Sequence, residues 1–176
     1  HLRMSGRLQI ASANATRNKH EHVILSFDDG RQLRFHDPRK FGRLNLVKDP
    51  GRILDRLGPE PLAAGFTAQN LGQLLQNRKR ILKSLLLDQT FIAGLGNIYV
   101  DEALWEARLH PLRSSATLSH DEIATLHRAI RTVLRRGLKN LGTTLGTGKA
   151  NFYSVARRRG RNSDRLMVFR RTGEPC

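Results

Sequence analysis

The chain has 176 residues, with 31 lysines and arginines against 15 aspartates and glutamates, giving a formal net charge of +16 with histidine neutral. Its 39% hydrophobic content suffices for a core and excludes wholesale disorder, while no apolar run reaches the roughly 20 residues of a membrane span and one cysteine cannot form an internal disulfide. So large a positive excess favours a polyanionic partner, most commonly nucleic acid, and a solubilising surface charge is the alternative.

The first part of the chain is predicted to form β-strands. Apolar and polar residues alternate over 23–27, an Asp-Gly pair at 29–30 is typical of a tight turn, and the alternation resumes over 33–35. This pattern predicts a β-hairpin. Further strands are expected at 8–10 and at 44–46, and so few short strands need another layer to pack on.

A linker followed by helices is predicted in the middle of the chain. Residues 49–66 hold three of the six prolines, which indicates a hinge. Thr67 is a suitable N-cap for a helix in which leucines recur at helical spacing from Leu71 to Leu75. The same spacing recurs over 81–86.

A longer amphipathic helix is predicted next. Ser119 followed by Glu122 forms a capping box, and apolar residues then lie on one face as far as Leu134. Arginines cover the rest of this helix, and a solvated face is one reading of this set: Arg128, Arg131, Arg135 and Arg136. Beyond the helix, the glycine- and arginine-rich residues 142–165 predict a loop, and 166–169 predict one more strand.

Two short motifs carry candidate chemistry. Gly94 and Gly96 flank one apolar residue before a helix that Asn97 is suited to cap, and such a helix start binds phosphate; a tight helix–helix turn is the alternative. The second motif, 36–42, places two cations beside Phe41 at an Asp-Pro turn. A cation beside an aromatic ring suits stacking against nucleic-acid bases, and a loop around a buried phenylalanine is the alternative.

Together these motifs resemble those of the formamidopyrimidine-DNA glycosylase family, which with its endonuclease VIII relatives excises oxidised bases from DNA. They span essentially the whole chain in this order: HLRMSG at 1–6, HDPRKFG at 36–42, LGPEPL at 57–62, LLLDQTFIAGLGNIYVDEALWEARLHP at 85–111, GTT at 142–144 and RTGEPC at 171–176. The DPRKFG and LGPEPL stretches are more similar to the formamidopyrimidine branch than to the endonuclease VIII branch.

The resemblance implies an α+β protein. In this family a β-sandwich domain is joined by a hinge to a helical domain with a helix–two-turn–helix motif, and DNA binds in the cleft between them. The organisation predicted here is a partial antiparallel β-sandwich of the catalytic type at 1–48, a hinge at 49–66, a helix–two-turn–helix DNA-binding domain at 67–145, a flexible lesion-capping loop at 146–165 and the start of a zinc ribbon at 166–176.

The resemblance also implies DNA contacts. Met4, Arg39 and Phe41 match the three side chains that fill the gap left by an extruded nucleotide, which offsets a base-flipping cost of a few kcal/mol. His1 matches a histidine that touches the DNA backbone, and Asn97 matches an asparagine that contacts a phosphate beside the lesion. The predicted DNA-binding residues are His1, Met4, Arg39, Phe41, Gly96, Asn97 and Tyr99.

The chain departs from the family at both ends. The family nucleophile is an N-terminal proline that attacks the sugar C1′ and forms a Schiff base, whereas this chain begins with His1 and its first proline is Pro38. We therefore predict no catalytic residue in this chain. Cys176 matches the first zinc ligand of a ribbon that would follow it, so no cofactor is expected in this chain and Zn²⁺ is expected in the full-length family member.

We accordingly expect part of a bifunctional DNA glycosylase and AP lyase of base-excision repair, inactive or impaired by itself. Its expected partner is double-stranded DNA containing abasic sites or oxidised bases such as 8-oxoguanine and formamidopyrimidines, bound by a monomer in the cytoplasm, at the bacterial nucleoid, with no membrane. A catalytically inactive module that binds damaged DNA is the first alternative. A ribosomal or RNA-binding protein with an accidental resemblance is the second.

Overall fold

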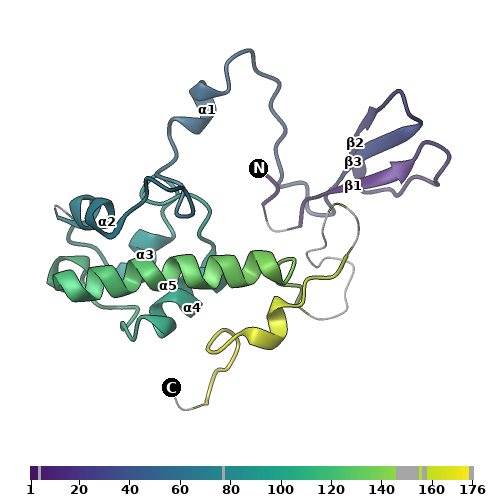
Figure 1. Cartoon of the computed structure of the whole chain (residues 1–176). Coiled ribbons are helices and arrows are strands. Elements are labelled where there is room, and N and C mark those ends of the chain that lie inside the picture. Colours follow the sequence, from purple (N-terminus) through teal and green to yellow (C-terminus); the bar gives the residue numbers. More distant parts are fainter. Residues whose placement is uncertain (4, 77, 146–154, 156–157, 175–176) are drawn as a thin grey trace. The chain divides into compact units, whose positions relative to one another are not determined.

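The computed structural model describes residues 1–176 except 4, 77, 146–154, 156–157 and 175–176. The chain combines strands and helices, as predicted (Figure 1). It divides into two compact units, each made of two stretches of sequence. The first unit comprises His1–Val47 and Gly137–Arg165, and the second comprises Lys48–Arg136 and Leu166–Cys176.

A three-stranded antiparallel sheet lies in the first unit. Its strands are β1 (Arg7–Ser12), β2 (Glu21–Ser26) and β3 (Arg31–His36). The strand order is β1-β3-β2, so the predicted hairpin of β2 and β3 is confirmed, and its turn contains Gly30 at a φ of +77°, which glycine adopts without strain. The register places Leu8 and Val23 opposite Phe35, one on each neighbouring strand.

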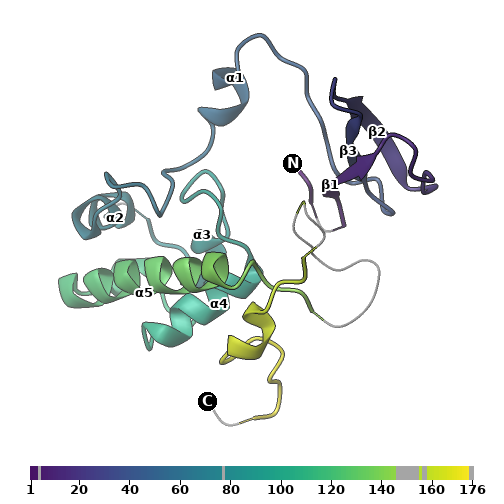
Figure 2. The ribbon, with the colours of Figure 1, turned by 45° about the vertical axis from the view of Figure 1, so that its right-hand side comes forward.

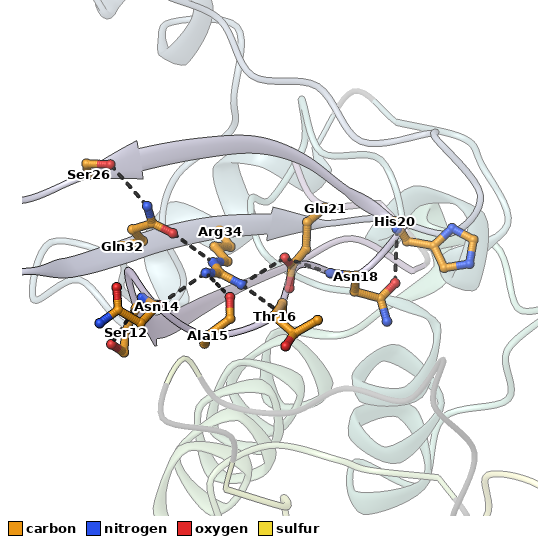
Figure 3. A network of polar contacts seen from close by, with 10 residues as sticks. All are labelled: Ser12, Asn14, Ala15, Thr16, Asn18, His20, Glu21, Ser26, Gln32 and Arg34. Atoms are coloured by element: carbon orange, nitrogen blue, oxygen red, sulfur yellow. Dashed lines mark hydrogen bonds and ion pairs between the residues drawn. The ribbon is translucent and has the colours of Figure 1, made fainter.

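The two faces of this sheet differ in chemistry because successive side chains point to opposite sides. One face is apolar, and part of it is open, since the Leu25 side chain is 54% exposed. The opposite face buries polar groups, among them Gln9, Gln32 and Arg34. Arg34 is 1% exposed and lies at the centre of a hydrogen-bonded network with Glu21 and the loop after β1 (Figure 3).

The strand predicted at 44–46 is wrong. Residues 41–47 have no regular secondary structure, and Leu46 is fully exposed. The backbone of this segment pairs with the N-terminus instead of the sheet: the Arg43 N–H donates to His1 O at 2.9 Å, and the His1 amino group donates to Arg43 O at 2.8 Å. Two alternating leucines indicate a strand only where a neighbouring strand accepts them.

Helices form most of the second unit. They are α1 (Gly51–Leu54), α2 (Ala68–Leu75), α3 (Leu82–Leu86), α4 (Asn97–Glu106), the 3₁₀ turn η1 (Ser115–Thr117) and α5 (His120–Lys139), while the 3₁₀ turn η2 (Asn162–Arg165) belongs to the first unit. The boundary between the units falls inside α5. Helices α4 and α5 lie side by side in both views (Figures 1 and 2), and apolar residues of α2 to α5 share one core.

No helix among the described residues is long and apolar enough to cross a membrane.

Both predicted helix starts are confirmed. At α2, the Thr67 N–H donates to Asn70 Oδ1 at 3.1 Å and the Asn70 N–H donates to Thr67 Oγ1 at 3.2 Å. At α5, the Ser119 N–H donates to Glu122 Oε2 at 2.8 Å, and the Glu122 N–H returns a bond to Ser119 Oγ at 3.3 Å. Each box satisfies N–H groups that have no partner inside the helix.

The arginines of α5 are not all a solvated face. Arg131 Nη1 donates to Pro61 O at 2.8 Å and to Ala63 O at 3.0 Å, so it ties α5 to the segment before α2. Arg136 lies 3.9 Å from a carboxylate oxygen of Glu102 and 3.8 Å from one of Glu106, both on α4. These two arginines therefore hold helices together. The other two, Arg128 and Arg135, are exposed.

The strand predicted at 166–169 is also wrong. Glu102, which is 1% exposed, accepts the N–H groups of Met167 at 2.8 Å, Val168 at 2.9 Å and Phe169 at 3.0 Å. Successive N–H groups point in opposite directions along a strand, so three that meet one carboxylate require a curled backbone. The curl continues into Arg170, whose φ is +64°. A buried carboxylate on α4 thus overrides the local preference of an apolar run.

Candidate nucleic-acid interface

A buried aspartate organises the turn at 37–42. Asp37 follows β3, is fully buried, and accepts the Ser5 hydroxyl at 2.5 Å and the Gly42 N–H at 2.7 Å. Burial by itself raises the pKa of Asp37, but the hydrogen bonds from Ser5 and from backbone N–H groups of the turn outweigh it and lower that pKa. The carboxylate therefore stays charged and holds the turn around itself.

This turn displays a cation beside an aromatic ring. Arg39 and Phe41 are both exposed, Phe41 by 52%, and the guanidinium carbon of Arg39 lies 4.8 Å from the centre of the Phe41 ring. This exposure rules out the alternative of a loop closed around a buried phenylalanine. Gly42 packs on Phe35, where an added Cβ would lie 2.4 Å from the ring, so a larger residue would displace the turn.

The N-terminal segment lies beside the same turn. Ser5 reaches Asp37, and the backbone pairing with Arg43 places His1 just after the turn. The His1 ring accepts the Arg3 N–H through Nδ1 at 2.9 Å, and Arg3 has a φ of +55°. His1 is exposed. The structure therefore brings His1 into one unit with Arg39 and Phe41, whereas Met4 lies outside the described residues.

We expect replacement of Asp37 by asparagine to loosen this turn and to cost about 1–3 kcal/mol of unfolding free energy at neutral pH, because the amide nitrogen cannot accept hydrogen bonds. Since the pKa of Asp37 is lowered from 3.8, its contribution is complete above that pH and is lost as the pH falls through the lowered value. Urea denaturation of both proteins from neutral pH down to about pH 2 measures this difference.

The matched control is Asp28→Asn, because Asp28 is an exposed aspartate of the same unit. If the stability difference between wild type and Asp37→Asn stays constant from neutral pH down to about pH 2, the charge of Asp37 does not hold the turn.

The second group of predicted residues lies in the second unit, in a loop at 88–96 that leads into α4. Gly94 has a φ of +80°, Leu95 is buried, and Gly96 is extended. The first helical bond of α4 runs from the Val100 N–H to Gly96 O at 2.9 Å. The predicted cap is therefore wrong in one respect: Gly96 is the N-cap and Asn97 is the first helical residue, so no side chain caps this helix start.

The start of α4 is suited to an anion. N–H groups in the first turn of a helix have no acceptor inside the helix, and they carry partial positive charge. The first turn of α4 contains no acidic residue, and Gly96 and Asn97 are exposed. Asp101, further along the helix, is paired with Lys83 at 2.7 Å. Tyr99 is half-buried and packs against the core, so of the three predicted residues it faces the interior most.

Two residues that the sequence patterns did not single out shape this loop. Asp88 accepts Arg80 Nη1 at 2.8 Å and the Thr90 N–H at 3.0 Å; the bond from Arg80, followed by those from Thr90, lowers the pKa of Asp88 to about 2. Gln89 bonds to both sides of the glycine turn, since its Oε1 accepts the Gly94 N–H at 2.9 Å and its Nε2 donates to Leu95 O at 2.8 Å. The one signal in the sequence for Gln89 was a side chain that can both donate and accept hydrogen bonds, placed shortly before two glycines.

A metal site does not fit the described residues. Within them, no group of three or more histidine, cysteine or acidic side chains could hold a metal ion. Cys176, the predicted zinc ligand, lies outside the described residues and is the only cysteine of the sequence, whereas a structural zinc site needs four nitrogen or sulfur ligands. Most of the predicted lesion-capping loop, at 146–154 and 156–157, likewise lies outside the described residues.

Two family models match this chain. The formamidopyrimidine-DNA glycosylase N-terminal domain matches residues 1–44, and the formamidopyrimidine-DNA glycosylase H2TH domain matches residues 57–148. The first match includes the turn at 37–42, and the second includes the loop at 88–96.

Curated relatives match along the whole chain. A formamidopyrimidine-DNA glycosylase of Roseiflexus sp. (strain RS-1) is 52% identical over 178 residues, and one of Protochlamydia amoebophila (strain UWE25) is 48% identical over 176 residues. Each comparison covers 100% of this chain and 64% of the relative. The chain therefore spans slightly less than two thirds of the length of these relatives.

Solved structures also match along the whole chain. Lactococcus lactis Fpg in complex with DNA containing an abasic site gives a TM-score of 0.87 at 35% identity. MutM in complex with DNA containing carbocyclic 8-oxo-G gives a TM-score of 0.85 at 36% identity. Both comparisons cover 100% of this chain and 64% of the other.

Proposed function

Because this chain belongs to the formamidopyrimidine-DNA glycosylase family, we propose that it is the damaged-DNA-binding part of a base-excision repair glycosylase. The observation that carries the proposal is the exposed pair of Arg39 and Phe41 on a turn locked by Asp37. The formal net charge of +16 supports it, because neutralising phosphates and releasing their counterions drives binding to DNA.

The turn at 37–42 would act on a duplex from which one nucleotide has been extruded. Extrusion removes stacking and costs a few kcal/mol. The ring of Phe41 offers a flat apolar surface to the neighbouring bases, and the guanidinium of Arg39 offers a planar cation with hydrogen-bond donors. Since Asp37 fixes the turn before DNA arrives, little conformational freedom is lost on binding. Met4 remains a predicted third member of this group.

The start of α4 would bind a backbone phosphate. Its first-turn N–H groups and the exposed amide of Asn97 are suitable donors for a phosphate oxygen. We propose His1 as a further contact to the DNA backbone. Such contacts fix the position of the duplex without reading its sequence, which suits a protein that searches for rare lesions.

The proposed reaction of the whole protein is the family one, directed at oxidised purines. An amine attacks the sugar C1′, the bond from C1′ to the base breaks, and the resulting Schiff base leads to strand cleavage by β,δ-elimination. In this chain the first proline nitrogen is that of Pro38, which lies in a peptide bond and is not a nucleophile. We propose that the chain by itself binds damaged DNA and does not cleave it by this route.

The proposal also covers oligomeric state and location. We propose action as a monomer in the bacterial cytoplasm, at the nucleoid.

Zinc is proposed for the whole protein with Cys176 as one ligand; the other ligands would have to come from outside the described residues. When bound, a structural zinc ion would stabilise a ribbon rather than take part in the reaction. The alternative function, a catalytically inactive module that binds damaged DNA, requires the same contacts.

The proposal predicts that this chain binds a duplex containing a tetrahydrofuran abasic analogue more tightly than the undamaged duplex. Phe41→Ala should weaken binding to the damaged duplex by about 5- to 100-fold, the range for loss of one aromatic stacking contact. Fluorescence anisotropy measures both. Borohydride treatment of the chain with a natural abasic site should trap no covalent adduct.

Phe27→Ala is the matched control, because Phe27 is a 45% exposed phenylalanine of the same unit, at the tip of the hairpin. Equal binding to both duplexes, or equal losses for the Phe41 and Phe27 variants, would count against damage recognition through this turn. A trapped adduct would instead identify a nucleophilic amine within this chain.

A further inference from the structure

We propose that Gln89 is a positioning residue that aims the Gly96 N–H at a DNA phosphate. This inference rests on the proposed binding of DNA at the start of α4. Gln89 itself is half-buried beneath the glycine turn and need not touch the DNA. Its role follows from where its carboxamide holds the backbone.

The peptide between Leu95 and Gly96 is held from one side. Gln89 Nε2 donates to Leu95 O at 2.8 Å, so this carbonyl group points toward the Gln89 side chain. In a trans peptide the C=O and the following N–H point in opposite directions. The Gly96 N–H therefore points away from Gln89, and Gly96 itself is exposed. One hydrogen bond thus sets the direction of a donor at the N-cap of α4.

Without Gln89, the peptide between Leu95 and Gly96 would lose the hydrogen bond that sets its direction. Gly94 adopts a φ of +80°, and no heavy atom lies within 4 Å of the position that a Cβ of Gly96 would take. Glycines separated by one residue allow many backbone conformations. Gln89 spans this pair, because its Oε1 accepts the Gly94 N–H at 2.9 Å while its Nε2 holds Leu95.

The backbone of Gln89 is held in place by a neighbouring segment. The Gly58 N–H donates to Gln89 O at 2.8 Å, and the Ala93 N–H donates to Pro59 O at 3.1 Å, so the segment around Gly58 lies along the loop. A Cβ on Gly58 would lie 2.5 Å from the backbone of Phe91, which shows how closely the two segments approach. Backbone hydrogen bonds therefore hold the first half of the loop, and the carboxamide of Gln89 holds the second half.

The test is a double-mutant cycle between Gln89 and Asn97 in the full 176-residue chain. Gln89→Met keeps the length of the side chain and removes its hydrogen bonds. Binding to a duplex with a tetrahydrofuran abasic analogue should weaken about tenfold in Gln89→Met and about tenfold in Asn97→Ala, the effect of losing one hydrogen-bonded contact each. Because both act on one phosphate, the double variant should lose clearly less than the product of the two.

A purely structural role would give a different pattern. In that case the two losses of affinity would multiply, because they would be independent. Gln69→Met is the matched control, since Gln69 is an exposed glutamine on α2, and it should bind like wild type. Multiplying losses, or wild-type affinity in Gln89→Met, would overturn the proposal.

A second readout separates this inference from the proposed function. Inorganic phosphate added to ¹⁵N-labelled protein should move the Gly96 and Asn97 amide signals in wild type, and clearly less in Gln89→Met. Failure of wild type to prefer damaged DNA, with this difference present, would refute the proposed function alone. Identical phosphate responses in the two proteins would refute the positioning role of Gln89, whatever the DNA result.

Discussion

Replacing Arg34 with methionine should lower the free energy of unfolding by about 3–5 kcal/mol, the usual cost of removing one member of a buried ion pair. The Arg34 and Glu21 side chains are 1% and 4% exposed, and Nη1 lies 3.1 Å from Oε2. The same guanidinium donates to Ala15 O at 2.8 Å and to Ser12 O at 3.1 Å (Figure 3). Methionine is apolar and donates nothing, so a buried carboxylate and carbonyl groups would lose their partner.

Urea denaturation measures this loss, and hydrogen exchange of the β3 amides, compared with those of α4 in the second unit, shows whether it is confined to the first unit. The matched control is Arg31→Ala. Arg31 pairs with Asp29 in the same hairpin, but the two side chains are 62% and 49% exposed, so the change should cost much less stability than the loss of Arg34. Losses of similar size in the two variants would mean that the buried network contributes no more than a surface pair.

The second large effect is expected at Glu102. Glu102→Ala should cost about 3 kcal/mol of unfolding free energy, because three backbone N–H groups at 167–169 and the nearby Arg136 lose their acceptor. Water reaches part of this segment, since Met167 is 40% exposed, which keeps the cost below that of a fully buried set. The released segment should also be cut faster by trypsin after Arg170.

Glu106→Ala is the control for Glu102, because Glu106 lies on the same helix, faces the same arginine at 3.8 Å and has a 35% exposed side chain. It should change stability by no more than about 1 kcal/mol and leave the rate of cleavage unchanged. Equal stability and equal cleavage of the two variants would show that the carboxylate of Glu102 does not anchor the C-terminal segment.

Much of the fold could be predicted because local patterns agreed with the tertiary structure. The hairpin followed from alternation around an Asp-Gly turn, the N-cap Thr67 from its place before a leucine repeat, and the capping box of Ser119 and Glu122 from residue spacing. In α5 the predicted apolar face is buried at Leu126, Ile130 and Val133. Each of these patterns is carried by residues close together in the sequence, so no knowledge of distant contacts was needed.

The strands at 44–46 and 166–169 could not be excluded from the sequence. Each is a short apolar run, and its conformation is decided by a distant partner: His1 for the residues around Arg43, and Glu102 for residues 167–169. The same limit applies to the arginines of α5, where only the structure separates Arg131, which binds backbone carbonyl groups, from exposed neighbours. Side-chain contacts to distant backbone leave no periodic signal.

The candidate site was only partly predictable for the same reason. The motifs located Arg39, Phe41 and the glycine turn, because exposed cations, rings and glycines are visible in the sequence. The residues that hold them in place are an aspartate and a glutamine whose surroundings the sequence does not reveal. Asp37 is fully buried, and Gln89 binds backbone on both sides of Gly94.

The carboxylate of Glu102 occupies the position that an anion would take on the backbone at 167–169. Consecutive N–H groups that converge on one point form a cradle that binds anions, and the cradle at 167–169 is filled by the chain's own acid. The N-terminus of the same helix, at Asn97, carries no acid in its first turn and is exposed. The protein therefore contains one set of N–H groups that its own carboxylate fills, at 167–169, and a second set at the start of α4 with no acid in its first turn.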